Sequence, residues 1–357
     1  MVTRGFERRD LLLLVAAAIL GAGYLGLGHF GTERKAPWYD EKLAASRLAQ
    51  EAMAAIKAEK RARGIPIDKT ADINETGMIG QRSSGMTTTL GSLDAKRTST
   101  NPDFAAVAVE LLKKCGAKKG DRIAVNLSGS FPALGLSVLS AMQTLELQPV
   151  VIASLGASMW GASDPAFSWL DMEQVVLDRK LIRTGLSAVS LGGARDVGQD
   201  MDDEVRESLR TRVRAAAVPL IEEPDLGKNV AQRTALYFAG GAPTCFVNIG
   251  GNLASGGAEG DFGALRPGLM RSFDEAGAGV GGLIRAFLER KVPVIHLLNL
   301  KVLAAMYGLP YDPIPQAQPG SGGVFRETRY SLAYIAAILA LGLAMCVAYV
   351  RSGKRRR

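Results

Sequence analysis

Four apolar segments of this chain each run into a stretch rich in glycine, serine or asparagine. These stretches are Asn126–Ser130 (NLSGS), Ala153–Ser158 (ASLGAS), Ser190–Asp196 (SLGGARD) and Asn248–Gly257 (NIGGNLASGG). Glycine lets a ligand approach the backbone, and serine and asparagine donate hydrogen bonds to carboxylate or phosphate oxygens. The same residue types also supply turns and helix caps, so each stretch has a purely structural alternative.

A basic segment near residue 96 adds cations to this set. Ala95–Asn101 (AKRTSTN) combines two positive side chains with hydroxyl donors, a combination that suits carboxylates and phosphates. The alternative is a solvated loop. If these segments converge, the expected anion or polymer ligands are Lys96, Arg97, Asn126, Ser128, Ser130, Ser158, Arg195, Asn248 and Asn252.

Nucleophilic catalysis is a second interpretation of the first stretch. Ser128 and Ser130 follow an apolar segment and precede a helical pattern, but neither lies in Gly-x-Ser-x-Gly. A serine nucleophile needs a base, and the chain has only two histidines. His29 lies at the edge of an apolar segment, which leaves His296 as the histidine candidate and keeps a lysine base open. A histidine in an apolar strand is also a common core residue.

Other chemistries have little support in the sequence. No cluster of histidine, cysteine and carboxylate residues has the spacing of a metal site, so no metal is expected. Two Gly-x-Gly-x-x-Gly matches, Gly21–Gly26 and Gly277–Gly282, lack the preceding strand that a dinucleotide site requires. The chain has no Walker lysine motif either. We therefore expect no cofactor.

The positioning elements alternate between short apolar runs and helical patterns. The predicted strands are Arg122–Leu127, Pro149–Leu155, Ala188–Leu191, Cys245–Ile249 and Val292–Leu298. Predicted helices lie between them, near 102–115, 133–146, 168–182, 199–216, 228–240 and 279–290. Because these strands are apolar on both faces, the pattern predicts an α/β fold of the doubly wound type, with a mostly parallel sheet flanked by helices. The carboxyl ends of its strands would bring the polar stretches to one edge.

Two uncharged segments stand at the ends of the chain. Leu11–Gly28 and Tyr330–Val350 are close to the ~20 residues that a membrane-spanning helix needs. Arginines precede the first and a basic tail follows the second, which predicts two spans with both termini cytoplasmic and the intervening residues extracytoplasmic. A cleaved signal peptide is an alternative for the first segment, although its apolar run continues to Leu27.

Charge is concentrated in these ends. The chain of 357 residues carries a formal net charge of +8, but residues 31–330 hold 35 basic and 33 acidic side chains, a net +2. A nearly neutral central part gives no support for binding nucleic acid, and the terminal arginines suit the anionic surface of a lipid bilayer. Cys115 and Cys245 lie in this part, where free thiols are favoured over a disulfide.

These observations give a linear organisation. We expect a cytoplasmic tail (1–10), a transmembrane helix (11–28), an amphipathic helix with a polar loop (29–100) and an extracytoplasmic α/β domain (101–309). A linker (310–329), a second transmembrane helix (330–350) and a basic cytoplasmic tail (351–357) complete the chain.

Four segments carry a family resemblance. They read GSLDAKRTSTNPDFAAV, GDRIAVNLSGSFPALGLSVLSAM, PVVIASLGASMWGASDPAFSWLDME and SLGGARDVGQD. With the two apolar ends, they resemble the bacterial poly-gamma-glutamate system protein family over most of residues 35–310. The resemblance implies as partners the amide ligase and the membrane subunits of the poly-gamma-glutamate synthase. It assigns no catalytic residues.

Together these lines favour an anchored accessory protein of the inner membrane. It would bind or guide nascent poly-gamma-glutamate, a capsule-type polyanionic polymer, or scaffold its synthase. One alternative is an extracytoplasmic serine hydrolase or transferase that acts on the polymer, with Ser128 or Ser130 and His296. Another is an assembly factor whose spans alone carry the function.

Overall fold

The computed structural model describes residues 8–257, 265–276 and 281–354 and divides the chain into two compact units. One unit combines the two ends of the chain, up to Ala36 and from Arg326 onward, and the other is Pro37–Phe325. The second unit therefore includes the amphipathic helix, the polar loop and most of the linker, which the sequence had suggested were separate from the α/β domain. Residues 37–325 form one body because the amphipathic helix supplies part of its core.

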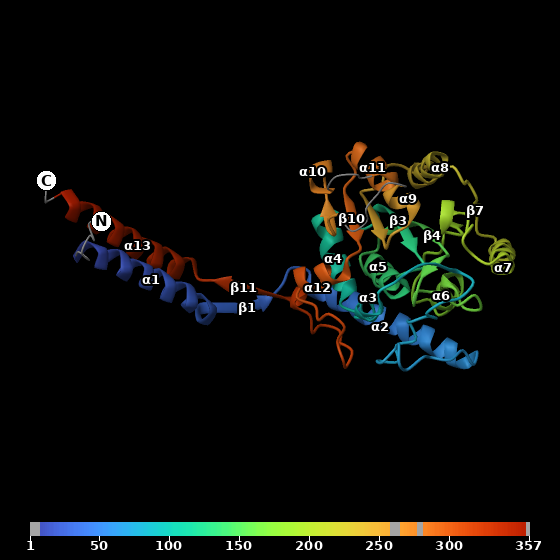
Figure 1. Ribbon diagram of the computed structural model, residues 1–357, viewed down its shortest axis with the longest axis horizontal. Coiled ribbons are helices and arrows are strands. Elements are labelled where there is room, and N and C mark those ends of the chain that lie inside the picture. The colour runs from blue at the N-terminus through green and yellow to red at the C-terminus, as the bar shows by residue number, and fades with distance from the viewer. Residues whose placement is uncertain (1–7, 258–264, 277–280, 355–357) are drawn as a thin grey trace, which may run out of the picture. The chain divides into compact units, whose positions relative to one another are not determined.

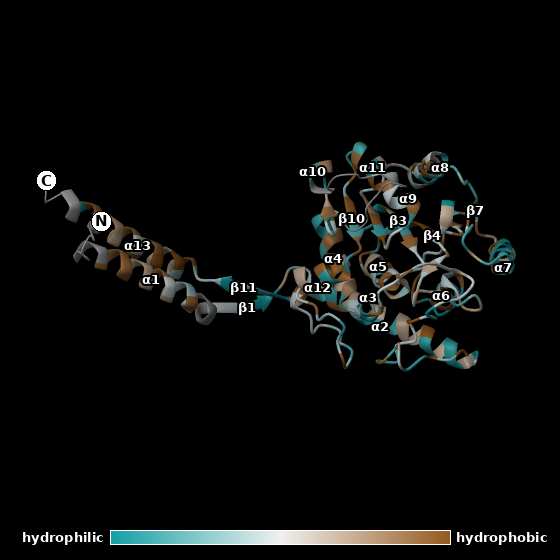
Figure 2. Ribbon diagram, in the orientation of Figure 1, coloured by the Kyte–Doolittle hydropathy of each residue, from teal (hydrophilic) through white to brown (hydrophobic). Residues whose placement is uncertain are grey.

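The terminal unit consists of two long helices and a strand pair (Figures 1 and 2). Strand β1 (Gly31–Lys35) pairs antiparallel with β11 (Arg326–Tyr330), and helices α1 (Arg8–Phe30) and α13 (Leu332–Lys354) pack side by side. Within α13, Leu332–Arg351 is long and apolar enough to cross a membrane, whereas the apolar part of α1 is shorter.

Glycines bring these two helices close together. A Cβ on Gly23 would lie 2.7 Å from the side chain of Ile338, and one on Gly342 would lie 3.0 Å from Leu20. The hydroxyl of Tyr334 donates to the carbonyl of Gly23 at 3.3 Å. Small residues at such crossings allow the backbone contact that stabilises helix pairs in lipid.

A seven-stranded sheet with the order β7-β6-β4-β3-β8-β10-β9 forms the centre of the larger unit. All neighbours in it are parallel except β9, which pairs antiparallel with β10, so the expected mostly parallel sheet is confirmed. The strands are β3 (Arg122–Ser128), β4 (Gln148–Ser154), β6 (Ala188–Ser190), β7 (Leu220–Ile221), β8 (Cys245–Ile249), β9 (Gly268–Met270) and β10 (Val294–Leu297). After β3 the chain builds outward through β4, β6 and β7, and then returns to place β8 on the other side of β3.

Helices cover both faces of this sheet (Figure 1). Alternate residues of β3 enter two separate cores, Val125 and Leu127 on one face and Ala124 on the other. The first face carries α2 (Tyr39–Ala62), α4 (Phe104–Lys114), α5 (Pro132–Thr144) and α6 (Trp169–Asp178). The second carries α8 (Leu226–Phe238), α9 (Leu253–Gly256) and α11 (Gly282–Glu289). This unit also contains α7 (Asp203–Ala215), α10 (Phe273–Ala276), α12 (Leu300–Met306) and the short helix α3 (Leu93–Ser99), described below.

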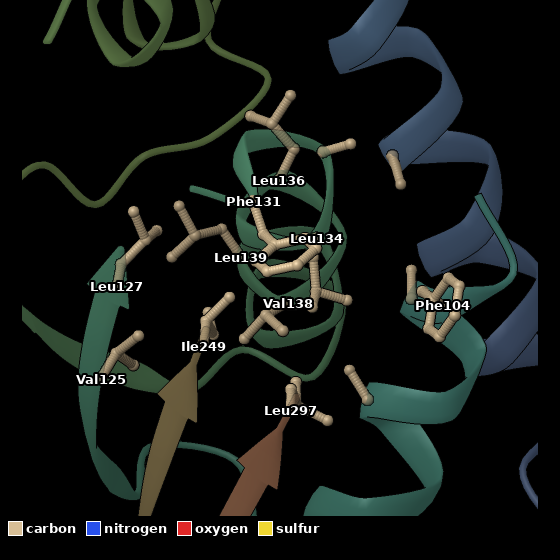
Figure 3. Close-up of a cluster of buried hydrophobic side chains, with 14 of the residues drawn as sticks. Phe104, Val125, Leu127, Phe131, Leu134, Leu136, Val138, Leu139, Ile249 and Leu297 are labelled. Carbon is tan, nitrogen blue, oxygen red and sulfur yellow. The ribbon is translucent and has the colours of Figure 1, made fainter. Parts of the chain in front are cut away.

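Helix α5 is the centre of the first core (Figure 3). It begins with Pro132, whose fixed φ suits a first helical turn, and its leucines Leu134 and Leu136 are fully buried. Strand residues Val125 and Ile249 point toward it from the sheet. Each fully buried leucine contributes roughly 2 kcal/mol relative to an exposed one, so this helix is fixed firmly behind the end of β3.

The polar loop has more structure than the sequence indicated. Strand β2 (Thr87–Thr89) pairs in parallel with β5 (Ala157–Ser158), and the short helix α3 (Leu93–Ser99) follows. The Ser92 side chain caps α3 by accepting a hydrogen bond from the Ala95 amide at 3.2 Å. This cap and the β2–β5 pair hold Lys96 against the ends of the central strands.

Candidate functional site

A cavity of about 680 Å³ lies at the carboxyl ends of the central strands. Its floor includes Ser128 at the end of β3, Ser154 at the end of β4 and Asn252 after β8. The strand order reverses between β3 and β8, and such reversals are where open α/β sheets form ligand-binding crevices. The predicted convergence of polar stretches at one edge is therefore what the structure shows.

Lys96 reaches into this cavity from α3 and is only 2% exposed. Its Nζ donates to Ser158 Oγ at 2.7 Å and to the carbonyl of Ser130, and it lies 3.8 Å from the centre of the Phe131 ring. Burial lowers the pKa of Lys96 to about 7. Near neutral pH the amine is thus divided between its charged and neutral forms, so it can bind an anion or accept a proton.

A serine turn supports this lysine. Ser130 Oγ accepts hydrogen bonds from the Ser158 amide at 3.0 Å and from Ser128 Oγ at 3.0 Å. The turn requires glycine, because a Cβ on Gly129 would lie 2.6 Å from the carbonyl oxygen of Leu155. The Ser-Gly-Ser order therefore allows the end of β3 to pack directly against the segment that carries Ser158.

A fully buried polar layer lies beneath the cavity. Asn126, Asn248 and His296 stand side by side on β3, β8 and β10, in register. Asn126 Nδ2 donates to Asn248 Oδ1 at 2.8 Å and to Asn252 Oδ1 at 3.3 Å. Since Asn252 lines the cavity, the layer holds one of the cavity's own polar side chains in place.

A buried ion pair, Arg233–Asp196, continues this polar layer beyond Asn126. Arg233 of α8 is 0% exposed, and its Nη2 lies 2.6 Å from Oδ2 of Asp196, which is 1% exposed. Arg233 also donates to Asn126 Oδ1 at 3.1 Å and to Ser190 Oγ at 2.7 Å. Ser190 Oγ is 3.1 Å from Ser154 Oγ in the cavity floor. No sequence signal pointed to Arg233, because its hydrogen-bond partners Asp196, Ser190 and Asn126 lie 37 to 107 residues away in the chain.

His296 is fully buried in this polar layer. Its Nδ1 is 3.0 Å from Asn248 Nδ2, its Nε2 is buried without a partner, and burial lowers its pKa to about 4. No hydrogen bond among the described residues joins it to Ser128 or Ser130. The described contacts therefore contain no serine–histidine pair, and the basic group in contact with a serine hydroxyl of the cavity lining is Lys96, which belongs to the residue type that the sequence left open as a base.

The predicted anion ligands fall into three groups. Five of them line the cavity, namely Lys96, Ser128, Ser130, Ser158 and Asn252. Asn126 and Asn248 are buried below it. Arg97 and Arg195 lie outside the lining: Arg97 Nε donates to Asp312 Oδ1 at 2.6 Å, and Arg195 Nε donates to the Pro224 carbonyl at 3.3 Å. A long basic side chain pairs with the nearest carboxylate or carbonyl, which a sequence pattern does not specify.

The cavity also has ligand candidates that sequence analysis missed. Ser154, Asp200 and Lys301 line it, and Lys301 is exposed. A positional signal for Lys301 was present, since it follows the fifth predicted strand as Leu298-Asn-Leu-Lys301, although this segment lacks the glycine and serine of the other stretches.

Metal ligands and thiols complete the inventory of reactive groups. In the described ranges, no group of three or more histidine, cysteine, aspartate or glutamate residues could hold a metal ion. Cys115 and Cys245 are free thiols. The neighbouring thiol of Cys115 and burial raise the pKa of Cys245. These thiols do not line the cavity.

Comparisons of the chain with protein-family models, with curated proteins and with solved structures returned no match.

Proposed function

We propose that this protein is a membrane-anchored extracytoplasmic accessory protein of poly-gamma-glutamate biosynthesis or export, and that its cavity binds carboxylates of the polymer. The observation that carries the proposal is the 680 Å³ cavity at the strand reversal, with serine hydroxyls and a lysine amine in its lining. The segments that resemble the poly-gamma-glutamate system family include Lys96, Ser128, Ser130 and Ser158, which all line this cavity.

The chemistry of the cavity suits this polymer. Poly-gamma-glutamate carries one free carboxylate per residue on a backbone that contains methylene groups. Lys301 and the protonated form of Lys96 supply positive charge, and the serines supply hydroxyl donors. Leu253, Leu298 and Phe131 provide apolar walls on which methylene groups can pack.

The ends of the chain supply the anchor in this proposal. Both α1 and α13 would cross the inner membrane, with the arginine-rich termini in the cytoplasm against anionic lipid. The polymer then emerges on the side where Pro37–Phe325 lies. The amide ligase and membrane subunits of the synthase are the expected partners, and nucleic acid is not one.

Polymer binding is tested with the full-length protein in lipid nanodiscs. We expect poly-gamma-glutamate to bind at low salt and to bind more weakly as salt rises, because the contacts are ionic. Lys301→Glu should weaken binding about tenfold, roughly 1.4 kcal/mol. Lys228→Glu, which reverses an exposed charge on α8 outside the cavity lining, is the matched control. Absence of binding at low salt, or equal loss in both variants, would contradict the proposal.

Anchoring and orientation need their own test. A reporter inserted at the exposed turn Ala216–Ala217 after α7 should be active outside the cytoplasm, and one fused to the carboxyl terminus should be active inside. Exchange of both terminal helices for unrelated apolar helices distinguishes polymer binding from the alternative of an assembly factor whose spans alone carry the function. Retained polymer export would exclude that alternative, whereas lost export with intact polymer binding would favour it.

A further inference from the structure

The contact between Lys96 and Ser158 is more than carboxylate binding requires. A lysine that only binds anions is best left free in the cavity, but Lys96 Nζ is 2.7 Å from the Ser158 hydroxyl and is buried with it. A serine hydroxyl in contact with a lysine amine is a known solution for acyl transfer without histidine. This pair is the one place in the described cavity lining where a hydroxyl contacts a basic nitrogen.

We propose that Ser158 is the nucleophile and Lys96 the general base of an acyl-transfer reaction in this cavity, with a carboxamide or ester as substrate. The inference rests on the cavity being the functional site, as in the proposed function, and adds a reaction to it. If the bound polymer is the substrate, its amide bonds are the bonds that react.

The surroundings hold both groups in position. Ser158 lies in β5, opposite Thr89 of β2, and its amide donates to Ser130 Oγ at 3.0 Å. Lys96 is fixed by the Ser130 carbonyl and the Phe131 ring. Ser130 is therefore a positioning residue for both members of the pair.

The other serines have different contacts. Ser128 Oγ donates to Ser130 Oγ and accepts from the Ser130 amide at 3.2 Å, so these two hydroxyls are engaged with each other and with the backbone. Among the described contacts, neither Ser128 Oγ nor Ser130 Oγ bonds a lysine or histidine. This contrast selects Ser158 over the two serines favoured by the sequence.

No described hydrogen bond or ion pair joins Lys96 to a carboxylate. Lys301, Asp200 and the phenol of Tyr311 share the cavity wall, and Arg97 on the same helix pairs with Asp312. Burial alone lowers the pKa of Lys96 to about 7. A general base is most effective when its pKa is near the working pH, and this value meets that condition.

The reaction takes water or an amine as its second substrate, which releases the acyl group from the serine. Ser158 Oγ attacks the carbonyl carbon while its proton moves to Lys96 Nζ. The bond from the carbonyl carbon to the leaving nitrogen or oxygen then breaks, and the leaving group takes the proton from Lys96. Water or an amine attacks the resulting ester, Lys96 accepts its proton, and the proton returns to Ser158 Oγ as the ester bond breaks.

A fluorophosphonate probe tests this chemistry without knowledge of the substrate. The serine oxygen displaces fluoride from phosphorus and leaves a stable covalent adduct. With the full-length protein in nanodiscs, peptide mass spectrometry should place the adduct on Ser158. The labelling rate should rise with pH to a plateau, with its midpoint near 7, because only the neutral amine accepts the serine proton.

Variants separate a base from a structural role. Lys96→Met should slow labelling by about 10²-fold or more and remove the pH midpoint. Ser158→Ala should abolish labelling, whereas Ser208→Ala and Lys228→Met, exposed positions on α7 and α8, should label as the wild type does. If Lys96→Met does not fold, the wild-type protein alone still tests the proposal, through the residue that carries the adduct and the pH dependence of the labelling rate.

The outcomes distinguish this inference from the proposed function. An adduct on Ser128 or Ser130, a pH-independent rate, or no adduct on a protein that binds poly-gamma-glutamate would overturn the acyl-transfer pair and leave polymer binding in place. Labelling of Ser158 without any binding of the polymer would retain the pair and remove poly-gamma-glutamate as the ligand.

Discussion

The buried ion pair beneath the cavity makes a strong prediction about stability. Arg233→Met keeps most of the volume of the side chain and removes its charge. Asp196 then remains 1% exposed, with Asn229 Nδ2 at 2.9 Å and Ser190 Oγ at 2.8 Å as its closest remaining donors. Breaking a buried pair in this way leaves an uncompensated charge.

The expected cost follows from the geometry of this pair. Removing one partner of a buried ion pair costs about 3–5 kcal/mol, most of which is the penalty for the charge left behind. Arg233→Met with Asp196→Asn removes both charges, so it should cost clearly less than the sum of the two single variants. We expect a coupling free energy of about 1–3 kcal/mol between the two positions.

Urea unfolding of the full-length protein, followed by tryptophan fluorescence, measures these free energies. Trp160 and Trp169 both lie in the larger unit and report on its packing. A loss below about 1 kcal/mol for Arg233→Met, or additive single variants, would refute the interpretation that this layer is a coupled network.

Three further outcomes follow from other parts of the larger unit. Burial raises the pKa of Glu173 from 4.5 to about 8, so its contribution to stability is complete below pH 4.5 and is lost as pH rises through 8. Between pH 6 and pH 9 this loss should be on the order of 3 kcal/mol in urea unfolding, and Glu173→Gln should remove it. An unchanged pH dependence would contradict it. Gly129→Ala places a Cβ 2.6 Å from the Leu155 carbonyl oxygen and should lower the free energy of unfolding by about 1–3 kcal/mol in the same assay. Ser208→Ala, at an exposed position, is the control. The exposed Gly241 is not a suitable control, because its φ of +108° would strain any residue with a Cβ. Cys245 is fully buried, so it should react with maleimide only when the larger unit unfolds; labelling of the Cys245 peptide in the native protein, followed by mass spectrometry, would refute this.

The sequence predicted the centre of the fold well because the central strands are apolar on both faces. All five predicted strands are present, from β3 through β10. It did not predict β7, which has only two residues, or β9, which pairs antiparallel at the edge of the sheet. Such short edge strands carry little periodicity, and their place is decided by tertiary contacts.

The candidate site was predicted in part for a similar reason. The polar stretches meet because parallel strands share an edge, so Ser128, Ser158 and Asn252 could be expected there. The partner of Lys96 could not be predicted, because Lys96 and Ser158 are 62 residues apart in the chain and are brought together by the β2–β5 pairing. For His296 the sequence left two alternatives open, a base and a buried core residue, because the register that places it beside Asn248 is not visible in a single strand.

The central claim is that the cavity at the strand reversal binds the polymer. Hydrogen exchange of the full-length protein in nanodiscs, with and without poly-gamma-glutamate, tests it directly. Binding in the cavity predicts slower exchange in peptides covering 88–96, 128–131 and 154–158, which line it, with α7 unchanged. Protection confined to the terminal segments or to α7, with no change at the cavity, would contradict the claim.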